Sequence, residues 1–259
     1  MPVNFFNVTF SRTFLLLIIL VPIGSWADED LTIAVASNFQ RTAEKLATEF
    51  TLVTQIPIRI TAASTSNLYA QIINGAPYDI FLAADIERPK SLEANEFAVR
   101  GSRMTYAIGA LMLWSSDSSF EKGECVAALE SGSYRKLAIA NPEIAPYGLA
   151  AKEYLQAIGN WRDASSQLVF GENISQTLLF AVTGNVTFAL VARAQVVASL
   201  PVDATCIWKV PSSLHSDIEQ QGVLLSNSKS LESAQRFMNF LREPKAIAII
   251  ESSGYTVTE

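Results

Sequence analysis

The sequence predicts an α/β protein built mainly on parallel β-sheet, with helices covering both faces. Short apolar runs, typical of buried strands, alternate with stretches whose apolar residues recur at helical spacing. The 259 residues suffice for one large domain or two modest lobes, and no Gly/Ser-rich segment marks a flexible linker. If there are two lobes, we expect the chain to cross between them on ordered strands.

Eight apolar runs have the length and composition of strands that are buried on both faces. The second contains Pro57, which has no N–H to donate to a ladder, so we expect this run at the start or the edge of a sheet. The runs are Leu31–Ala36, Ile56–Ile60, Ile80–Ala83, Leu111–Trp114, Leu137–Ala140, Leu168–Phe170, Phe188–Val191 and Val223–Leu225.

The spacing of apolar residues and the residues typical of helix ends predict several helices. A helical face recurs between Ala234 and Leu241. Pro244 favours the first turn of a last helix, and Gly254 stands where that helix would end. An earlier helix carries its apolar face on Phe39, Ala43, Leu46, Ala47 and Phe50.

The first 27 residues have the pattern of a secretory signal peptide. Arg12 is the only charged residue among them, an apolar run over 14–21 follows it, and the segment ends in the small-x-small triplet Ser25–Ala27. The apolar run is too short to span a bilayer. We expect cleavage after Ala27 and a periplasmic product, with a retained N-terminal anchor as the alternative.

Charge and residue counts exclude several classes of function. With 19 Lys and Arg against 25 Asp and Glu, the chain lacks the basic surface that nucleic-acid binding needs. His215 is the only histidine, so a multi-histidine metal site is impossible. No nucleophile–base pair is evident, so we expect that the protein is not an enzyme. We also expect no directly bound metal cation and no cofactor. Cys125 and Cys206 could form a disulfide or remain two buried free thiols.

Four predicted strand-to-helix junctions share one character. Each would present free backbone N–H groups at a helix N-terminus, where the helix dipole favours negative charge. Three add hydroxyl or amide side chains, and one adds the phenol of Tyr147. For any single junction, simple N-capping is the alternative. The junctions are Ala36–Phe39, Ala63–Asn67, Ala145–Gly148 and Glu172–Ser175.

These junctions contain no Lys or Arg, and Glu172 is their only charged residue. A site built from them would hold an anion with neutral donors and helix N-termini alone. Such a site suits a fully deprotonated tetrahedral oxyanion. A protonated phosphate would need a carboxylate acceptor, for which Glu172 is the only nearby candidate.

The segment Ser64–Asp85, which begins Ser-Thr-Ser-Asn-Leu-Tyr-Ala-Gln, closely resembles the molybdate-binding proteins of bacterial ABC importers. Further motifs match at Ala34–Phe39, Ala140–Gly148 and Gly171–Gln176. The resemblance implies a two-lobed periplasmic-binding-protein fold of type II, with the ligand in the cleft between the lobes. It also implies capture of molybdate, and of tungstate, for delivery to an inner-membrane ABC permease.

The resemblance also implies which residues contact the ligand. The family pattern Gly-Ser-Ser-Gly reads Ala63-Ser64-Thr65-Ser66 here, which leaves the loop path open. Where some members use a Tyr on a later strand, this chain has Ala192, and Tyr147 is the substitute donor. The implied contacts are Ser37, Asn38, Thr65, Tyr147 and the N–H of Ile174, with Ser64 and Asn173 as further candidates.

The expected division is a first lobe of residues 28–105 plus 222–259 and a second lobe of residues 106–221, in a monomer. Another tetrahedral oxyanion, such as sulfate or thiosulfate, is the alternative ligand. An exported enzyme is the alternative from a different class.

Overall fold

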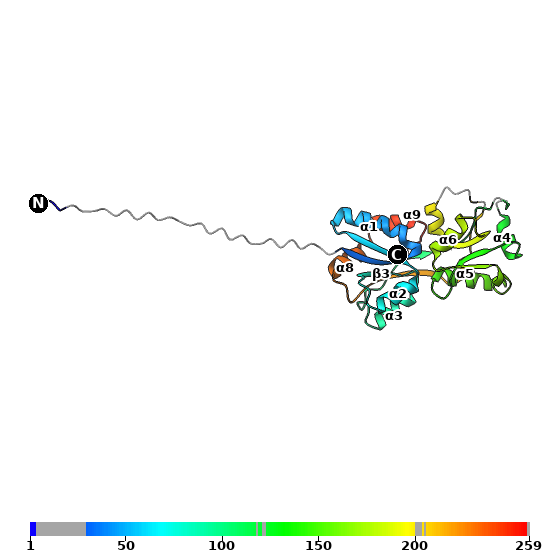
Figure 1. Cartoon of the computed structure of the whole chain (residues 1–259), viewed down its shortest axis with the longest axis horizontal. Coiled ribbons are helices and arrows are strands. Elements are labelled where there is room, and N and C mark those ends of the chain that lie inside the picture. The colour runs from blue at the N-terminus through cyan, green and yellow to red at the C-terminus, as the bar shows by residue number, and fades with distance from the viewer. Residues whose placement is uncertain (4–29, 118, 121–122, 200–203, 205, 258–259) are drawn as a thin grey trace.

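The computed structural model describes residues 1–3, 30–117, 119–120, 123–199, 204 and 206–257. All but the first three residues of the predicted signal peptide lie outside this set, so cleavage after Ala27 stays a prediction. Figure 1 shows two mixed α/β bodies side by side, and each contains one sheet. No helix within the described ranges is both long enough and apolar enough to cross a membrane.

The first lobe is built on a sheet with the strand order β2-β1-β3-β10-β4. Helices α1, α8 and α9 pack against one face, and α2 and α3 pack against the other. The strands are β1 (Leu31–Ala36), β2 (Ile58–Ala63), β3 (Ile80–Leu82), β4 (Met104–Gly109) and β10 (Ile218–Leu224). The helices are α1 (Gln40–Thr54), α2 (Thr65–Ile73), α3 (Glu87–Ala94), α8 (Leu231–Phe240) and α9 (Pro244–Ser252).

Strand β1 shows why this sheet is covered on both faces. Ile33 and Val35 point into the core that Phe237 of α8 helps to form. Ala34 points the other way, into a second core with Leu68 of α2. Successive side chains of a strand alternate between faces, so an unbroken apolar run buries both.

The second lobe is built on a sheet with the order β7-β6-β8-β5-β9. Helices α4 and α5 pack against one face, and α6 packs against the other. The disulfide between Cys125 and Cys206 joins α4 to β9, which decides between the two alternatives left open for these cysteines. The strands are β5 (Leu111–Ser115), β6 (Leu137–Ala140), β7 (Leu168–Gly171), β8 (Phe188–Ala192) and β9 (Cys206–Lys209). The helices are α4 (Glu124–Glu130), α5 (Pro146–Ala157), α6 (Ile174–Val182) and α7 (Arg193–Ser199), with short 3-10 turns η1 (Ser37–Phe39), η2 (Asp163–Ser166) and η3 (Ser212–Leu214).

The chain crosses between the lobes beside two paired strands of the first sheet, β4 and β10. Strand β4 ends at Gly109 and β5 begins at Leu111, and the return segment enters β10 at Ile218. The expected lobe boundaries, 105/106 and 221/222, fall inside β4 and β10.

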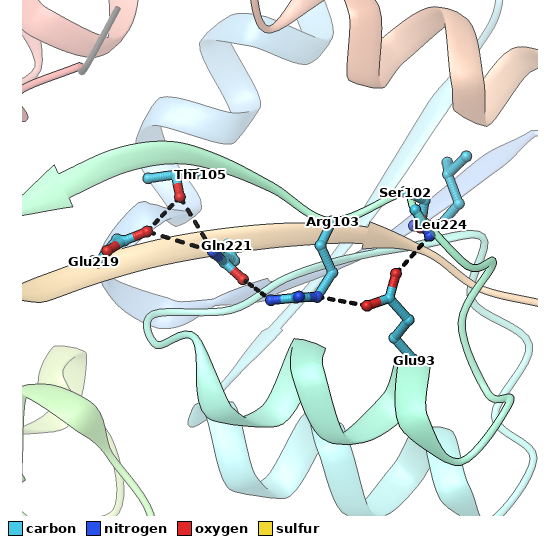
Figure 2. Close-up of polar contacts among 8 residues, drawn as sticks. Glu93, Ser102, Arg103, Thr105, Glu219, Gln221 and Leu224 are labelled. Carbon is cyan, nitrogen blue, oxygen red and sulfur yellow. Dashed lines mark hydrogen bonds and ion pairs between the residues drawn. The ribbon is translucent and has the colours of Figure 1, made fainter.

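A polar network ties these two strands to α3 (Figure 2). Arg103 donates to Glu93 at 2.7 Å and to the side-chain oxygen of Gln221 at 3.1 Å. Gln221 in turn donates to Thr105 Oγ1 at 3.2 Å, and the Thr105 hydroxyl donates to Glu219. Side-chain hydrogen bonds therefore hold β4 and β10 together, in addition to the backbone hydrogen bonds between the two strands.

The expectation of mainly parallel sheet was wrong. Of the eight strand pairings in the described part of the chain, four are parallel and four antiparallel. A strand that follows a crossing enters its new sheet from the end that faces the other lobe. Strand β10 therefore pairs antiparallel with β3 and β4, and β5 pairs antiparallel with β8 and β9. Strands β4 and β9 were not predicted, and β10 was recognised only at its end because Gln220 and Gln221 interrupt its apolar run.

Other local predictions are confirmed. Strand β2 begins directly after Pro57 and is an edge strand. The predicted helices appear as α1, α8 and α9, with Pro244 in the first turn of α9 and Gly254 at a φ of 100° just beyond its end.

Candidate ligand-binding site

The four strand-to-helix junctions meet at one small cavity between the lobes. The space that it leaves open to the centre of a water-sized sphere is about 10 Å³. The ends of parallel strands and the starts of the following helices gather at one edge of a sheet, and the two lobes turn these edges toward each other. The first lobe contributes Ala36, Ser37, Asn38, Ala63, Ser64, Thr65 and Ala84, and the second contributes Ala145, Pro146, Tyr147 and Ile174.

Hydroxyl groups of the first lobe are free to donate into this cavity. Ser64 Oγ is buried and has no hydrogen-bond partner among the described residues. Thr65 Oγ1 accepts from the Ala84 N–H at 3.2 Å, which leaves its own proton available. Ser37 lines the same cavity from η1. Because an unsatisfied buried polar group costs about 1–3 kcal/mol, an unpartnered hydroxyl here marks a position where a bound atom would accept.

The start of α6 supplies a backbone donor. The Asn173 side chain accepts from the N–H groups of Ser175 at 2.9 Å and Gln176 at 3.0 Å, so it caps the helix. The Ile174 N–H has no acceptor within the described part of the chain, and Ile174 lines the cavity. Asn173 does not line it.

Tyr147 enters from the first turn of α5, which begins at Pro146. A Cβ atom on the next residue, Gly148, would lie 2.2 Å from the Ala140 carbonyl oxygen, so glycine is what allows this turn to approach the end of β6. Burial raises the pKa of the Tyr147 phenol well above its ordinary value. The phenol is therefore a neutral hydrogen-bond donor at physiological pH.

Asn38 lines the cavity, but both hydrogens of its side-chain amide are used within the protein. They go to Gln220 Oε1 at 2.9 Å and to the Tyr255 hydroxyl at 3.1 Å. Sequence reasoning missed Gln220, Tyr255 and Tyr106, which do not line the cavity but are hydrogen-bonded to the lining residue Asn38 or to one another. The available signal was the pair of glutamines that interrupts the apolar pattern of β10.

None of the described residues that line the cavity is charged. Arg88 donates to Ser66 Oγ, beside the cavity, at 2.8 Å, and it also forms an ion pair with Asp85 at 2.9 Å. Burial raises the pKa of Asp85, while the bonds from Arg88 oppose that rise. Glu172 is exposed and lies outside the lining, so the described lining residues offer donors and include no carboxylate acceptor. Among the described residues, no three His, Cys, Asp or Glu side chains gather as a metal site would require.

Two α/β lobes with a small cavity between them, whose described lining residues are uncharged and include hydrogen-bond donors, define a solute-binding protein of the two-lobed kind. The chain belongs to the bacterial extracellular solute-binding protein family, whose model matches residues 31–256. This membership confirms the two-lobed α/β fold and the expectation that the chain is a binding protein and not an enzyme.

Individual relatives share most of the chain. It is 37% identical over 226 residues to the molybdate-binding protein ModA of Azotobacter vinelandii, a match covering 87% of this chain and 89% of the relative. It is 38% identical over 228 residues to ModA of Rhodobacter capsulatus, covering 87% of each. The solved periplasmic molybdate-binding protein of A. vinelandii superposes with a TM-score of 0.83 at 34% identity, over 89% of this chain and 100% of that one.

Proposed function

We propose that this protein captures molybdate, and also tungstate, in the periplasm and delivers it to an inner-membrane ABC permease. Two relatives that are 37% and 38% identical to this chain over the aligned residues are named as molybdate-binding proteins. The observation that carries the proposal is the cavity itself, whose described lining residues offer hydrogen-bond donors from both lobes and include no charged side chain.

The proposed contacts are the hydroxyls of Ser37, Ser64 and Thr65 from one lobe, with the Tyr147 phenol and the Ile174 N–H from the other. A fully deprotonated oxyanion accepts at every oxygen and needs no acceptor from the protein. Hydrogen bonds to an ionised acceptor are roughly twice as strong as those between neutral groups. Sulfate makes the same bonds, so we assign the discrimination between the two dianions to cavity size.

Binding would proceed by closure of the lobes about the paired strands β4 and β10. Hydrogen bonds already join the lobes beside the cavity. The Ser66 N–H donates to the Ile144 carbonyl at 3.2 Å, and Ser175 Oγ donates to the Ser37 carbonyl at 3.3 Å. The first bond joins one junction to the residue just before another, and the second bond links two junctions, so closing the lobes would also bring the donors of both lobes together.

Export to the periplasm is supported by the signal-like N-terminus and by the Cys125–Cys206 disulfide, a bond that persists in oxidising compartments. We also propose that the protein acts as a monomer and needs no cofactor.

The test is a calorimetric titration of the purified mature chain with molybdate, repeated in a large excess of sulfate. Tight one-to-one binding that sulfate does not displace is expected. Binding of sulfate or thiosulfate without molybdate would overturn the ligand and retain the oxyanion site. No heat with any oxyanion would overturn the proposed function.

A further inference from the structure

A chain of buried polar side chains lies next to the cavity. At its centre is Gln220 of β10, which is fully buried. Its neighbour Gln221 belongs to the separate network on Arg103 and Thr105 (Figure 2). The two glutamines thus serve different networks, and Gln220 is the one that reaches Tyr147.

The direction of the hydrogen bonds in the chain is set by a group that can only accept. The backbone carbonyl of Asn38 accepts the Tyr255 hydroxyl proton at 2.8 Å. With that proton used, the Tyr255 oxygen accepts from Asn38 Nδ2 at 3.1 Å. The other hydrogen of Nδ2 goes to Gln220 Oε1 at 2.9 Å. The side-chain amide of Asn38 is therefore oriented as a double donor.

The orientation of the Asn38 amide fixes the orientation of the Gln220 amide, which in turn decides how Gln220 is hydrogen-bonded to Tyr147. Gln220 Oε1 also accepts from the Tyr106 hydroxyl at 3.1 Å, a proton shared with the Ala83 carbonyl at 2.9 Å. Reversing the Gln220 amide would set its NH₂ against the NH₂ of Asn38. Its Nε2 therefore faces the Tyr147 oxygen, 3.4 Å away, and donates to it. The Tyr147 oxygen is an acceptor in that bond, so the phenol's own proton is free to point into the cavity.

We propose that Gln220 is the positioning residue that orients Tyr147 as a donor to the bound oxyanion and thereby favours anions that carry no proton. This inference deepens the proposed function and rests on it. Gly109 leaves the space in which Gln220 and Tyr147 meet. A Cβ on Gly109 would lie 2.0 Å from the Tyr147 oxygen and 2.9 Å from Gln220 Nε2.

The decisive variant is Gln220→Glu, with Gln221→Glu as the matched control that adds the same charge one residue along the strand. As a carboxylate, residue 220 would accept the Tyr147 proton and repel the anion, so we expect the affinity for molybdate at about pH 8 to fall by at least ~100-fold. A buried carboxyl becomes protonated as the pH falls and can then donate to Tyr147, so at about pH 5.5 the loss should shrink at least ~10-fold. The wild type and Gln221→Glu should stay within about 3-fold of each other across this range. A loss with Gln220→Glu that is the same at both pH values would overturn the inference, because a purely structural role predicts no recovery.

A double-mutant cycle tests whether Gln220 acts through Tyr147. Gln220→Met should weaken binding about 10-fold in the wild type and less than about 3-fold in the Tyr147→Phe background. An equal loss in both backgrounds would overturn the inference, and thermal unfolding without ligand checks that each variant is folded. Wild-type binding tests the proposed function, whereas ratios between variants test the inference. If the wild type takes sulfate instead, the same ratios are measured with sulfate.

Discussion

The guanidinium of Arg41 in α1 of the first lobe donates a 2.9 Å hydrogen bond to the carbonyl of Ala198 in α7 of the second lobe. Arg41 also lines a groove of about 430 Å³ between α1 and the helices α6 and α7. An exposed side chain thus links the two lobes outside the ligand cavity, and this link would be lost when the lobes move apart.

Removal of this link should speed ligand release. Arg41→Ala loses one exposed hydrogen bond of the closed form, about 0.5–1.5 kcal/mol, so we expect a roughly 2–10-fold faster dissociation of molybdate with little change in association. Stopped-flow fluorescence measures both rates. Arg59→Ala is the control, because Arg59 is an exposed arginine that pairs with Asp30 inside the first lobe. Equal dissociation rates in the two variants would contradict the role of Arg41.

Ser64→Ala should separate binding from stability. The unpartnered hydroxyl is a burden on the ligand-free protein, so its removal should leave the free energy of unfolding unchanged or raise it by about 1 kcal/mol. Affinity for molybdate should fall by about 1.5–3 kcal/mol, the value of a hydrogen bond to a charged group. Chemical denaturation and calorimetry measure the two quantities.

The chain offers a matched control for this variant. Ser253, at the end of α9, also has a buried hydroxyl without a hydrogen-bond partner among the described residues, and it does not line the cavity. Ser253→Ala should change stability in the same direction and leave affinity unchanged. If both variants lose affinity equally, Ser64 is not a ligand contact.

Alkaline pH should destabilise the protein through its buried tyrosines. Burial raises the pKa values of Tyr106, Tyr147 and Tyr255 above the ordinary 10.0. In the unfolded chain these phenols ionise near their ordinary pKa, so stability is fully present below that pH and falls as the pH rises through the folded pKa values. Denaturant titrations from about pH 8 to about pH 11 should show this fall, and it should be shallower in Tyr147→Phe.

The disulfide should matter for stability and little for the site. It joins α4 and β9 across 81 residues in the second lobe, and neither cysteine lines the cavity. Replacing both Cys125 and Cys206 by Ser should lower the free energy of unfolding by about 2–4 kcal/mol. The molybdate affinity of the folded variant should remain within about 3-fold of the wild type. A large loss of affinity without a loss of stability would contradict this separation.

Much of the local structure could be predicted from the sequence because local patterns decide it. Strand β1 has the predicted bounds, and Pro57 and Pro244 mark element starts where a missing N–H is tolerated. The four junctions were also recognisable, since apolar runs followed by small polar residues are a local signal. The resemblance to molybdate-binding proteins added the expectation that these junctions meet.

Only the tertiary structure decided which polar groups are free and which are used. Ser64 and Asn173 occupy equivalent places before a helix, yet Asn173 satisfies its own helix while Ser64 Oγ is left without a partner. Strand direction was likewise decided by the crossings at β4 and β10, and the glutamines that obscured β10 in the sequence form separate hydrogen-bond networks. Hydrogen-bond partners are set by what packs against a residue from distant parts of the chain, and a pattern of neighbours in sequence does not contain that information.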